Sequence, residues 1–150
     1  MLPDGKKYNI NVNKLLDECL VDLTDFILDL NREQLYEKGD IDVNYPTLKE
    51  HYAPSTIKQK RATATYKKTD FVTLRWTGEF YESFVLEIRD DDFLIRSTDP
   101  KADFLLNESK NFGDRFVNAL GLTEESKDKL KEKVLPLMIE KLRDELRNAG

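Results

Sequence analysis

His51 is the only histidine and Cys19 the only cysteine in the chain, so few side chains are suited to nucleophilic or general-base chemistry. Any nucleophile–histidine–carboxylate arrangement would depend on His51, which falls in a loop with no evident orienting carboxylate. Cys19 lies on the apolar face of a helical pattern, which predicts a buried and inert thiol. The six glycines are scattered and form no phosphate-binding loop. The sequence therefore predicts no catalytic residue and no bound cofactor.

Carboxylates are abundant, with 29 Asp and Glu residues, so any chosen acidic pair carries little information. Asp90, Asp91 and Asp92 lack the alternate spacing and the distal glutamate of a Ca²⁺ loop, and we interpret them as a solvated turn. A single cysteine excludes an internal disulfide and a cysteine-rich zinc site. We expect no metal site. A nuclease that binds its metal through Asp70, Glu79 or Asp90 is the least favoured of three hypotheses for the function; the other two are given below.

The densest basic cluster lies in a stretch from residue 40 to residue 78 that has little secondary-structure periodicity. Loops of this length are functional or disordered, and the tyrosines and Trp76 argue against disorder. We therefore predict an ordered arm that contacts a neighbouring subunit, although Trp76 has an equally simple role as an anchor to its own core. The candidate inter-subunit contacts are Tyr45, Tyr52, Lys58, Lys60, Arg61, Tyr66, Lys67, Lys68, Trp76 and Phe80.

The overall charge indicates which partners the basic cluster can have. The net charge of −5 and the pI of about 5.0 show that the chain as a whole lacks the basic character that is typical of nucleic-acid-binding domains. No aromatic residues are interleaved with the basic ones at a clear stacking spacing. Direct nucleic-acid binding is not expected, and a solvated loop or an acidic neighbouring subunit is favoured. The alternative function is a cytoplasmic binding module whose basic arm contacts nucleic acid or an acidic protein.

Two long helices are expected at the ends of the chain. Apolar residues recur at helical spacing from Val12 to Leu30, with aspartates on the opposite face, which predicts a helix over residues 13–37. Asn11 or Asn13 is the expected N-cap, and Gly39 the expected end. The second helix is predicted over residues 124–147, with Thr123 as N-cap and a kink near Pro136.

A small antiparallel sheet is expected between these helices. Residues 84–89 and 93–97 alternate with the period of a strand that has one buried face, on either side of an acidic turn, which predicts a hairpin within residues 80–98. A short helix capped by Ser55 is expected over residues 55–60, and residues 101–121 suggest a helical turn, a loop and a short strand near Phe116. The predicted fold is one α+β domain of 150 residues with an extended arm.

No apolar run approaches the roughly 20 residues that a membrane span needs. The first residues, MLPDGKKYNINVN, lack the apolar core of a signal peptide. We therefore expect a soluble protein that is made in a cytoplasm and has no membrane contact.

Three segments together carry a recognisable pattern: LYEKGDIDVNYPTLKEHYAPSTIKQKR, LRWTGEFYESFVLEI and FVNALGLTEESKDKL. They resemble phage virion-morphogenesis and tail-completion proteins. The matching positions are Gly39, Pro46, Leu48, Ser55, Thr56, Lys60, Leu74, Thr77, Gly78, Phe80, Ser83, Ala119, Leu120, Gly121, Leu122 and Thr123. Tyr45 stands where the family usually has tryptophan, and Trp76 lies inside the Thr-Gly motif instead.

The resemblance implies a structural role with no catalytic residues. Subunits of this family form rings at the head–tail joint or at the tail end, as connector, neck or tail-completion proteins. The resemblance thus implies a homo-oligomeric ring in the virion, assembled in the host cytoplasm with other phage structural proteins of the portal, neck or tail. From the residues, Thr77 and Gly78 provide a turn with positive φ that leads from the arm into the sheet.

Overall fold

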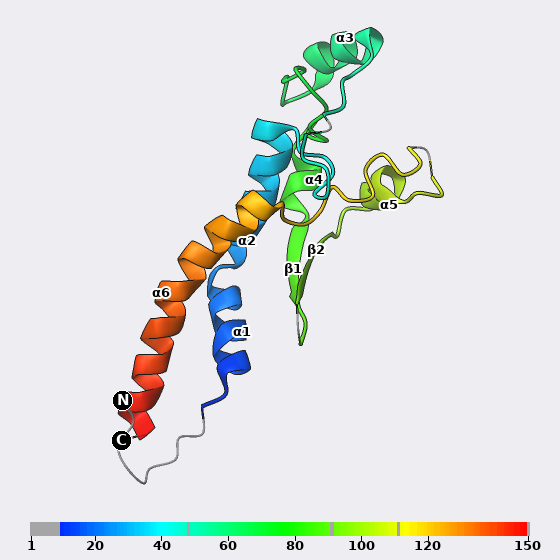
Figure 1. Ribbon diagram of the computed structural model, residues 1–150. Helices are drawn as coiled ribbons and strands as arrows, with labels where there is room; N and C mark the ends of the chain where they lie inside the picture. Colours follow the sequence, from blue (N-terminus) through cyan, green and yellow to red (C-terminus); the bar gives the residue numbers. More distant parts are fainter. Residues whose placement is uncertain (1–9, 48, 91, 111, 150) are drawn as a thin grey trace.

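The computed structural model describes residues 10–47, 49–90, 92–110 and 112–149. Residues 1–9, Leu48 and Asp91 lie outside the described residues. The chain folds as a mixture of helices and an antiparallel hairpin, which confirms the α+β class (Figure 1). Its elements are α1 (Val12–Asp22), α2 (Thr24–Glu33), η1 (Gln34–Lys38), α3 (Pro54–Thr63), α4 (Glu79–Glu82), β1 (Phe84–Ile88), β2 (Phe93–Ser97), α5 (Lys101–Leu106) and α6 (Glu124–Ala149).

The N-terminal helical region is divided, whereas the sequence predicted one long helix. Asn11 caps α1 as expected, its side chain accepting a hydrogen bond from the Lys14 amide at 3.1 Å. The helix breaks at Leu23 (φ −99°, ψ 14°), where the Thr24 hydroxyl donates to the Val21 carbonyl at 2.8 Å. Such bonds from Thr to the preceding turn compete with helical bonding and bend helices. The division therefore depends on a hydroxyl that the apolar periodicity does not reveal.

Gly39 ends the helical region, as predicted. It adopts φ 67° after the π-helical turn η1, and the next amide, of Asp40, donates to the Gln34 carbonyl at 2.8 Å. The Phe71 ring of the arm packs directly on this glycine. A β-carbon at position 39 would lie 2.6 Å from Phe71 Cδ2. Gly39 thus ends the helix in a left-handed conformation and also leaves the space into which the Phe71 ring packs.

Replacing Gly39 with alanine is expected to lower the free energy of unfolding by about 3 kcal/mol. Roughly 1–2 kcal/mol of this loss is the cost of the left-handed backbone conformation for a residue that has a β-carbon. Displacing the Phe71 ring adds roughly 1–3 kcal/mol, because the added methyl group overpacks the site. Gly113→Ala is the matched control, because Gly113 also has positive φ (57°) but a β-carbon added there would meet no atom within 4 Å. Urea unfolding of both variants measures the difference, and equal losses would show that Phe71 moves away freely.

The C-terminal helix α6 runs unbroken through Pro136 and lies alongside α1 and α2 (Figure 1). Pro136 is on the exposed side of the helix, so water can bind the Glu132 carbonyl that the missing amide leaves free. Thr123 is the N-cap, as expected, and its hydroxyl accepts from the Ser126 amide at 3.3 Å. Leu130 and Val134 face the other helices.

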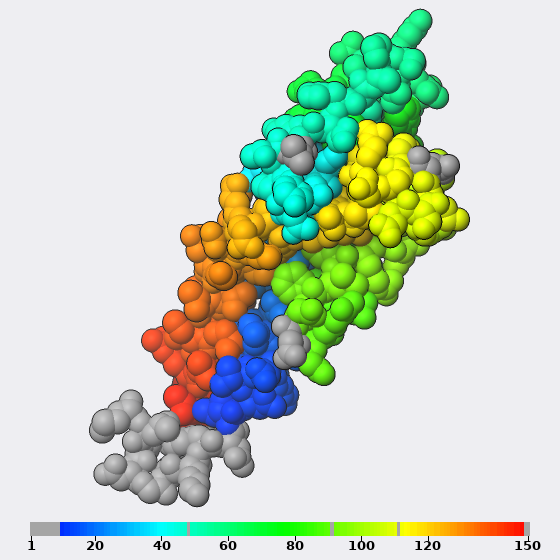
Figure 2. All heavy atoms as spheres, turned by 45° about the vertical axis from the view of Figure 1, so that its right-hand side comes forward, coloured from blue at the N-terminus to red at the C-terminus, as the bar shows by residue number. Residues whose placement is uncertain are grey.

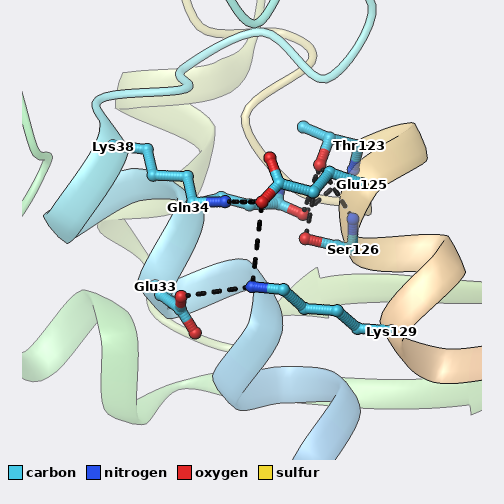
Figure 3. Close-up of polar contacts among 7 residues, drawn as sticks. All are labelled: Glu33, Gln34, Lys38, Thr123, Glu125, Ser126 and Lys129. Carbon is cyan, nitrogen blue, oxygen red and sulfur yellow. Dashed lines mark hydrogen bonds and ion pairs between the residues drawn. The ribbon is translucent and has the colours of Figure 1, made fainter. Parts of the chain in front are cut away.

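Two buried amide side chains attach the start of α6 to the end of the N-terminal helices. Asn31 donates to the Ala119 carbonyl at 3.0 Å and accepts from the Gly121 amide at 2.8 Å. Gln34 donates to the Gly121 carbonyl at 2.9 Å and accepts from the Thr123 amide at 2.9 Å. Around Gln34, Figure 3 shows ion pairs of Lys38 with Glu125 (2.6 Å) and of Lys129 with Glu33 (3.5 Å). The backbone of residues 119–123 is thereby hydrogen-bonded to side chains, as the backbone of a strand is to its neighbouring strand.

The predicted hairpin is confirmed but is shorter than the predicted range. Phe84 pairs with Ser97 and Ile88 with Phe93, and Phe84 and Ile95 are buried. Residues 80–82, expected at its start, instead belong to the helical turn α4, which follows Gly78 with φ 97°. The short helix after Pro54 is confirmed and is longer than predicted, but Ala53, not Ser55, is its N-cap. The strand expected near Phe116 is wrong, because that residue lies among turns.

The core is formed where the N-terminal helices, the hairpin and the segment before α6 meet. Its buried members include Ile27, Leu35, Tyr81, Phe84, Ile95, Phe116 and Ala119. Cys19 is fully buried, as predicted, and burial raises the pKa of its thiol. Among the described helices, none has the length and apolar character required to cross a membrane.

Candidate interaction surface on the arm

The arm, residues 40–78, is held together by backbone hydrogen bonds across its loops. The Val72 amide donates to the Glu50 carbonyl at 2.8 Å, and the Tyr66 amide donates to the Trp76 carbonyl at 3.0 Å. Helix α3 and the loop after it occupy one end of the molecule, far from the C-terminal end of α6 (Figure 1). The arm is therefore ordered by its own contacts, although most of it is irregular chain.

Lys60, predicted as a surface contact, is instead the central buried residue of the arm. Its side chain is fully buried, and its ammonium donates to the Tyr52 hydroxyl (3.0 Å), the Lys68 carbonyl (2.8 Å) and Thr73 Oγ1 (3.1 Å). Three neutral acceptors thus satisfy all three donors of the ammonium group. Burial raises the pKa of Tyr52, but the hydrogen bonds from Lys60 and Thr73 outweigh it and hold that pKa below its ordinary value. Lys60 positions the arm and does not face a neighbour.

Arg75 forms a second internal cation site in the arm. Its guanidinium carbon lies 3.7 Å from the ring centre of Tyr66, 4.7 Å from that of Tyr81 and 4.9 Å from that of Tyr36. Such cation–π contacts strengthen when they are shielded from water. The preceding residue, Leu74, has φ 59°, a left-handed conformation that is costly for a branched side chain. The strained residue thus directly precedes the arginine that packs among the three rings.

The remaining basic residues form the exposed part of the cluster, which we call the basic tip: Lys58, Arg61, Lys67 and the half-buried Lys68. Arg61 donates to Thr69 Oγ1 at 3.2 Å, and Lys67 donates to the Arg61 carbonyl at 2.6 Å. With the acidic residues that the structure describes, none of the four forms an ion pair. Residues 51–69 contain no Asp or Glu. The basic tip is therefore an acid-free surface on an acidic chain.

The aromatic candidates divide between surface and interior. Tyr45 is 60% exposed, whereas Phe80 is buried in the core and is not available to a neighbour in this conformation. Tyr52 and Tyr66 are half-buried and bind Lys60 and Arg75 within the arm. Trp76 is half-buried and lines a cleft of about 850 Å³ between the arm and the α5 region. The surface candidates are thus Tyr45, Trp76 and the basic tip.

The residues considered for catalysis are not brought together. His51 is exposed, and its Nδ1 lies 3.0 Å from the Asp70 carbonyl rather than from a carboxylate. Glu79 pairs with Lys101 at 2.9 Å, and Asp90 lies on the turn of the hairpin. Within residues 10–47, 49–90, 92–110 and 112–149, no three His, Cys, Asp or Glu side chains are placed to hold a metal ion.

Tyr81 is a key residue for the arm that the sequence reasoning missed. Its buried hydroxyl donates to the Thr73 carbonyl, and its ring packs against Phe84 and Arg75. Burial raises the pKa of Tyr81 far above its ordinary value, against a smaller opposing effect of Arg75. The signal that was available is the aromatic run Phe80, Tyr81 and Phe84, which follows the turn at Gly78.

Alkaline pH is expected to destabilise the native protein through Tyr81. An acid with a raised native pKa contributes stability below its unfolded pKa, near 10 for tyrosine, and loses it as the pH rises further. The loss from this residue is about 1.4 kcal/mol per pH unit above 10. Urea unfolding at pH 9 and pH 11 measures it, and Tyr81→Phe should remove this part of the slope. Tyr45→Phe, a change at an exposed ring, is the control that should leave the slope unchanged.

Comparison with protein-family models, with curated proteins and with solved structures found no match. A functional inference for this chain therefore rests on its own residues and on the resemblance of its short motifs.

Proposed function

We propose that the chain is a structural virion protein, a ring-forming subunit at a phage head–tail joint or tail. The observation that carries the proposal is the basic tip, an ordered, acid-free surface at one end of the molecule. An ordered basic arm on a chain of net charge −5 is suited to an acidic surface of a neighbouring copy. Head-to-tail contacts of this kind close into a ring when the rotation between subunits permits. The motif resemblance supports the same role, and it implies connector, neck or tail-completion positions.

Mass spectrometry of virions purified from cells that carry the gene tests this proposal. The protein is expected at a few to a few tens of copies per particle, and its absence from particles would refute the virion role. In the same particles, replacing Lys58, Arg61 and Lys67 together with serine is expected to prevent incorporation. The charge-matched control replaces Lys110, Lys133 and Arg143 with serine and should leave incorporation intact.

The alternative function is a cytoplasmic binding module, and it is favoured because the basic tip forms no ion pair with the acidic residues that the structure describes. Four cations that neutralise four phosphates would give a logarithmic salt slope of about −3 to −4 for DNA binding. A fluorescence titration with double-stranded DNA at several salt concentrations measures this slope. Binding that does not change with salt, or no binding at low salt, would exclude nucleic acid as the partner of the tip.

A further inference from the structure

A hollow of about 790 Å³ lies where α1, the β1–β2 hairpin and α6 meet, visible between the blue, green and orange parts of Figure 2. Its walls are mainly apolar, and they come from all three parts. The apolar residues that matter here are Leu16, Leu20, Leu94, Leu130, Val134 and Leu135. The hollow contains none of the residues of the basic tip.

Several large apolar side chains around this hollow are exposed to water. Leu135 is 61% exposed, and Leu16 and Leu94 are each more than one-third exposed. Val12 and Ile139 lie one helical turn from Leu16 and Leu135, on the same helix faces, and are about half exposed. These five account for five of the nine exposed large apolar residues in the part of the chain that the structure describes. Such a concentration of apolar surface marks an interaction site.

This face carries both a projection and a hollow. Leu135 and Ile139, four residues apart, form a ridge on α6, and the hollow lies directly beside that ridge. Ridges of this spacing pack into grooves between side chains of another helix. A two-fold contact requires a projection and its receptacle on the same face, because each copy must provide both.

The charges around the hollow have both signs. Lys127 and Lys131 lie on the α6 side, Asp17 lies on α1, and the hairpin contributes Asp90 and Asp92 together with one cation, Arg89. These three aspartates form no ion pair with any residue that the structure describes. A two-fold axis through the hollow turns α6 of each copy towards α1 and the hairpin of the other. In that arrangement Lys131, on α6 of each copy, is on the side that faces Asp17, on α1 of the other.

We propose that two copies of this chain pair about a two-fold axis through this face, with the Leu135–Ile139 ridge of each entering the hollow of the other. The occupant is a second copy because the face carries both the ridge and its receptacle, and both signs of charge. This inference uses residues outside the basic tip and does not rest on the proposed virion role.

Sedimentation velocity of the full chain, from low micromolar to near-millimolar concentration, tests the pairing. We expect a reversible monomer–dimer equilibrium that the double change Leu135→Glu and Ile139→Glu weakens by at least about thirtyfold. Val21→Glu is the matched control, because Val21 is 59% exposed on α1 but does not line the hollow. Circular dichroism of each variant checks that it remains folded. A single-chain mass at every concentration, or a dimer unaffected by the double change, would overturn the proposal.

A charge exchange tests the two-fold geometry. A two-fold dimer contains two contacts between residue 17 of one copy and residue 131 of the other. Either single change, Asp17→Lys or Lys131→Glu, makes both contacts repulsive and is expected to weaken self-pairing. In an equimolar mixture, both contacts join opposite charges, so the mixed dimer should form in preference to either parent dimer. A mixture that shows no such preference would overturn the proposed arrangement. Replacing Lys58, Arg61 and Lys67 with serine should leave this dimer unchanged, which separates it from contacts of the arm.

Discussion

Replacing Asn31 with leucine is expected to lower the free energy of unfolding by about 4 kcal/mol, the cost of leaving two backbone groups without partners. The Asn31 side chain is fully buried and bonds both the Ala119 carbonyl and the Gly121 amide. Leucine fills a similar volume but can neither donate nor accept. The segment that precedes α6 would then lose its attachment to α2.

Urea unfolding monitored by circular dichroism measures this effect. Gln59→Leu is the control, because Gln59 is an exposed amide on α3 and its loss should change stability by no more than about 0.5 kcal/mol. If Asn31→Leu costs less than about 1 kcal/mol, water reaches the Ala119 and Gly121 backbone groups and replaces the side chain. That result would contradict the interpretation of Asn31 as the attachment of the loop.

The second large effect is expected for Lys60→Met, at about 3 kcal/mol. Methionine keeps the length of the side chain but leaves the Lys68 carbonyl without this donor, and it removes the bonds to Thr73 Oγ1 and to the Tyr52 hydroxyl. Part of this loss is offset, because burying an ammonium group is itself costly. The net loss should fall mainly on the arm, since all three acceptors lie within it.

Trp76, the only tryptophan, lies in the arm and reports its unfolding directly. In Lys60→Met, the Trp76 fluorescence transition should shift to lower urea concentration, ahead of the helical signal measured by circular dichroism. Lys58→Met is the control, because Lys58 is exposed on the same helix and makes none of these bonds. Equal midpoints for the two variants would mean that the arm is not held by Lys60.

Asn31 and Lys60 contrast with the features of the fold that could be predicted from the sequence. Apolar spacing predicted the N-terminal helical region, the hairpin and α6, because each buries one face and its pattern repeats at the period of the element. The capping residues Asn11 and Thr123 and the end at Gly39 were predicted as well. Such signals are local, since a cap bonds to the backbone only two or three residues away.

The sequence by itself therefore determined the α+β class, the order of the main elements and the burial of Cys19. The tertiary structure alone decided that Lys60 lies inside the arm while Lys58, two residues earlier, is exposed. It also decided that Asn31 and Gln34 bond a loop nearly ninety residues away. A lysine or an amide is polar wherever it stands, and whether it is buried depends on acceptors that distant segments bring to it.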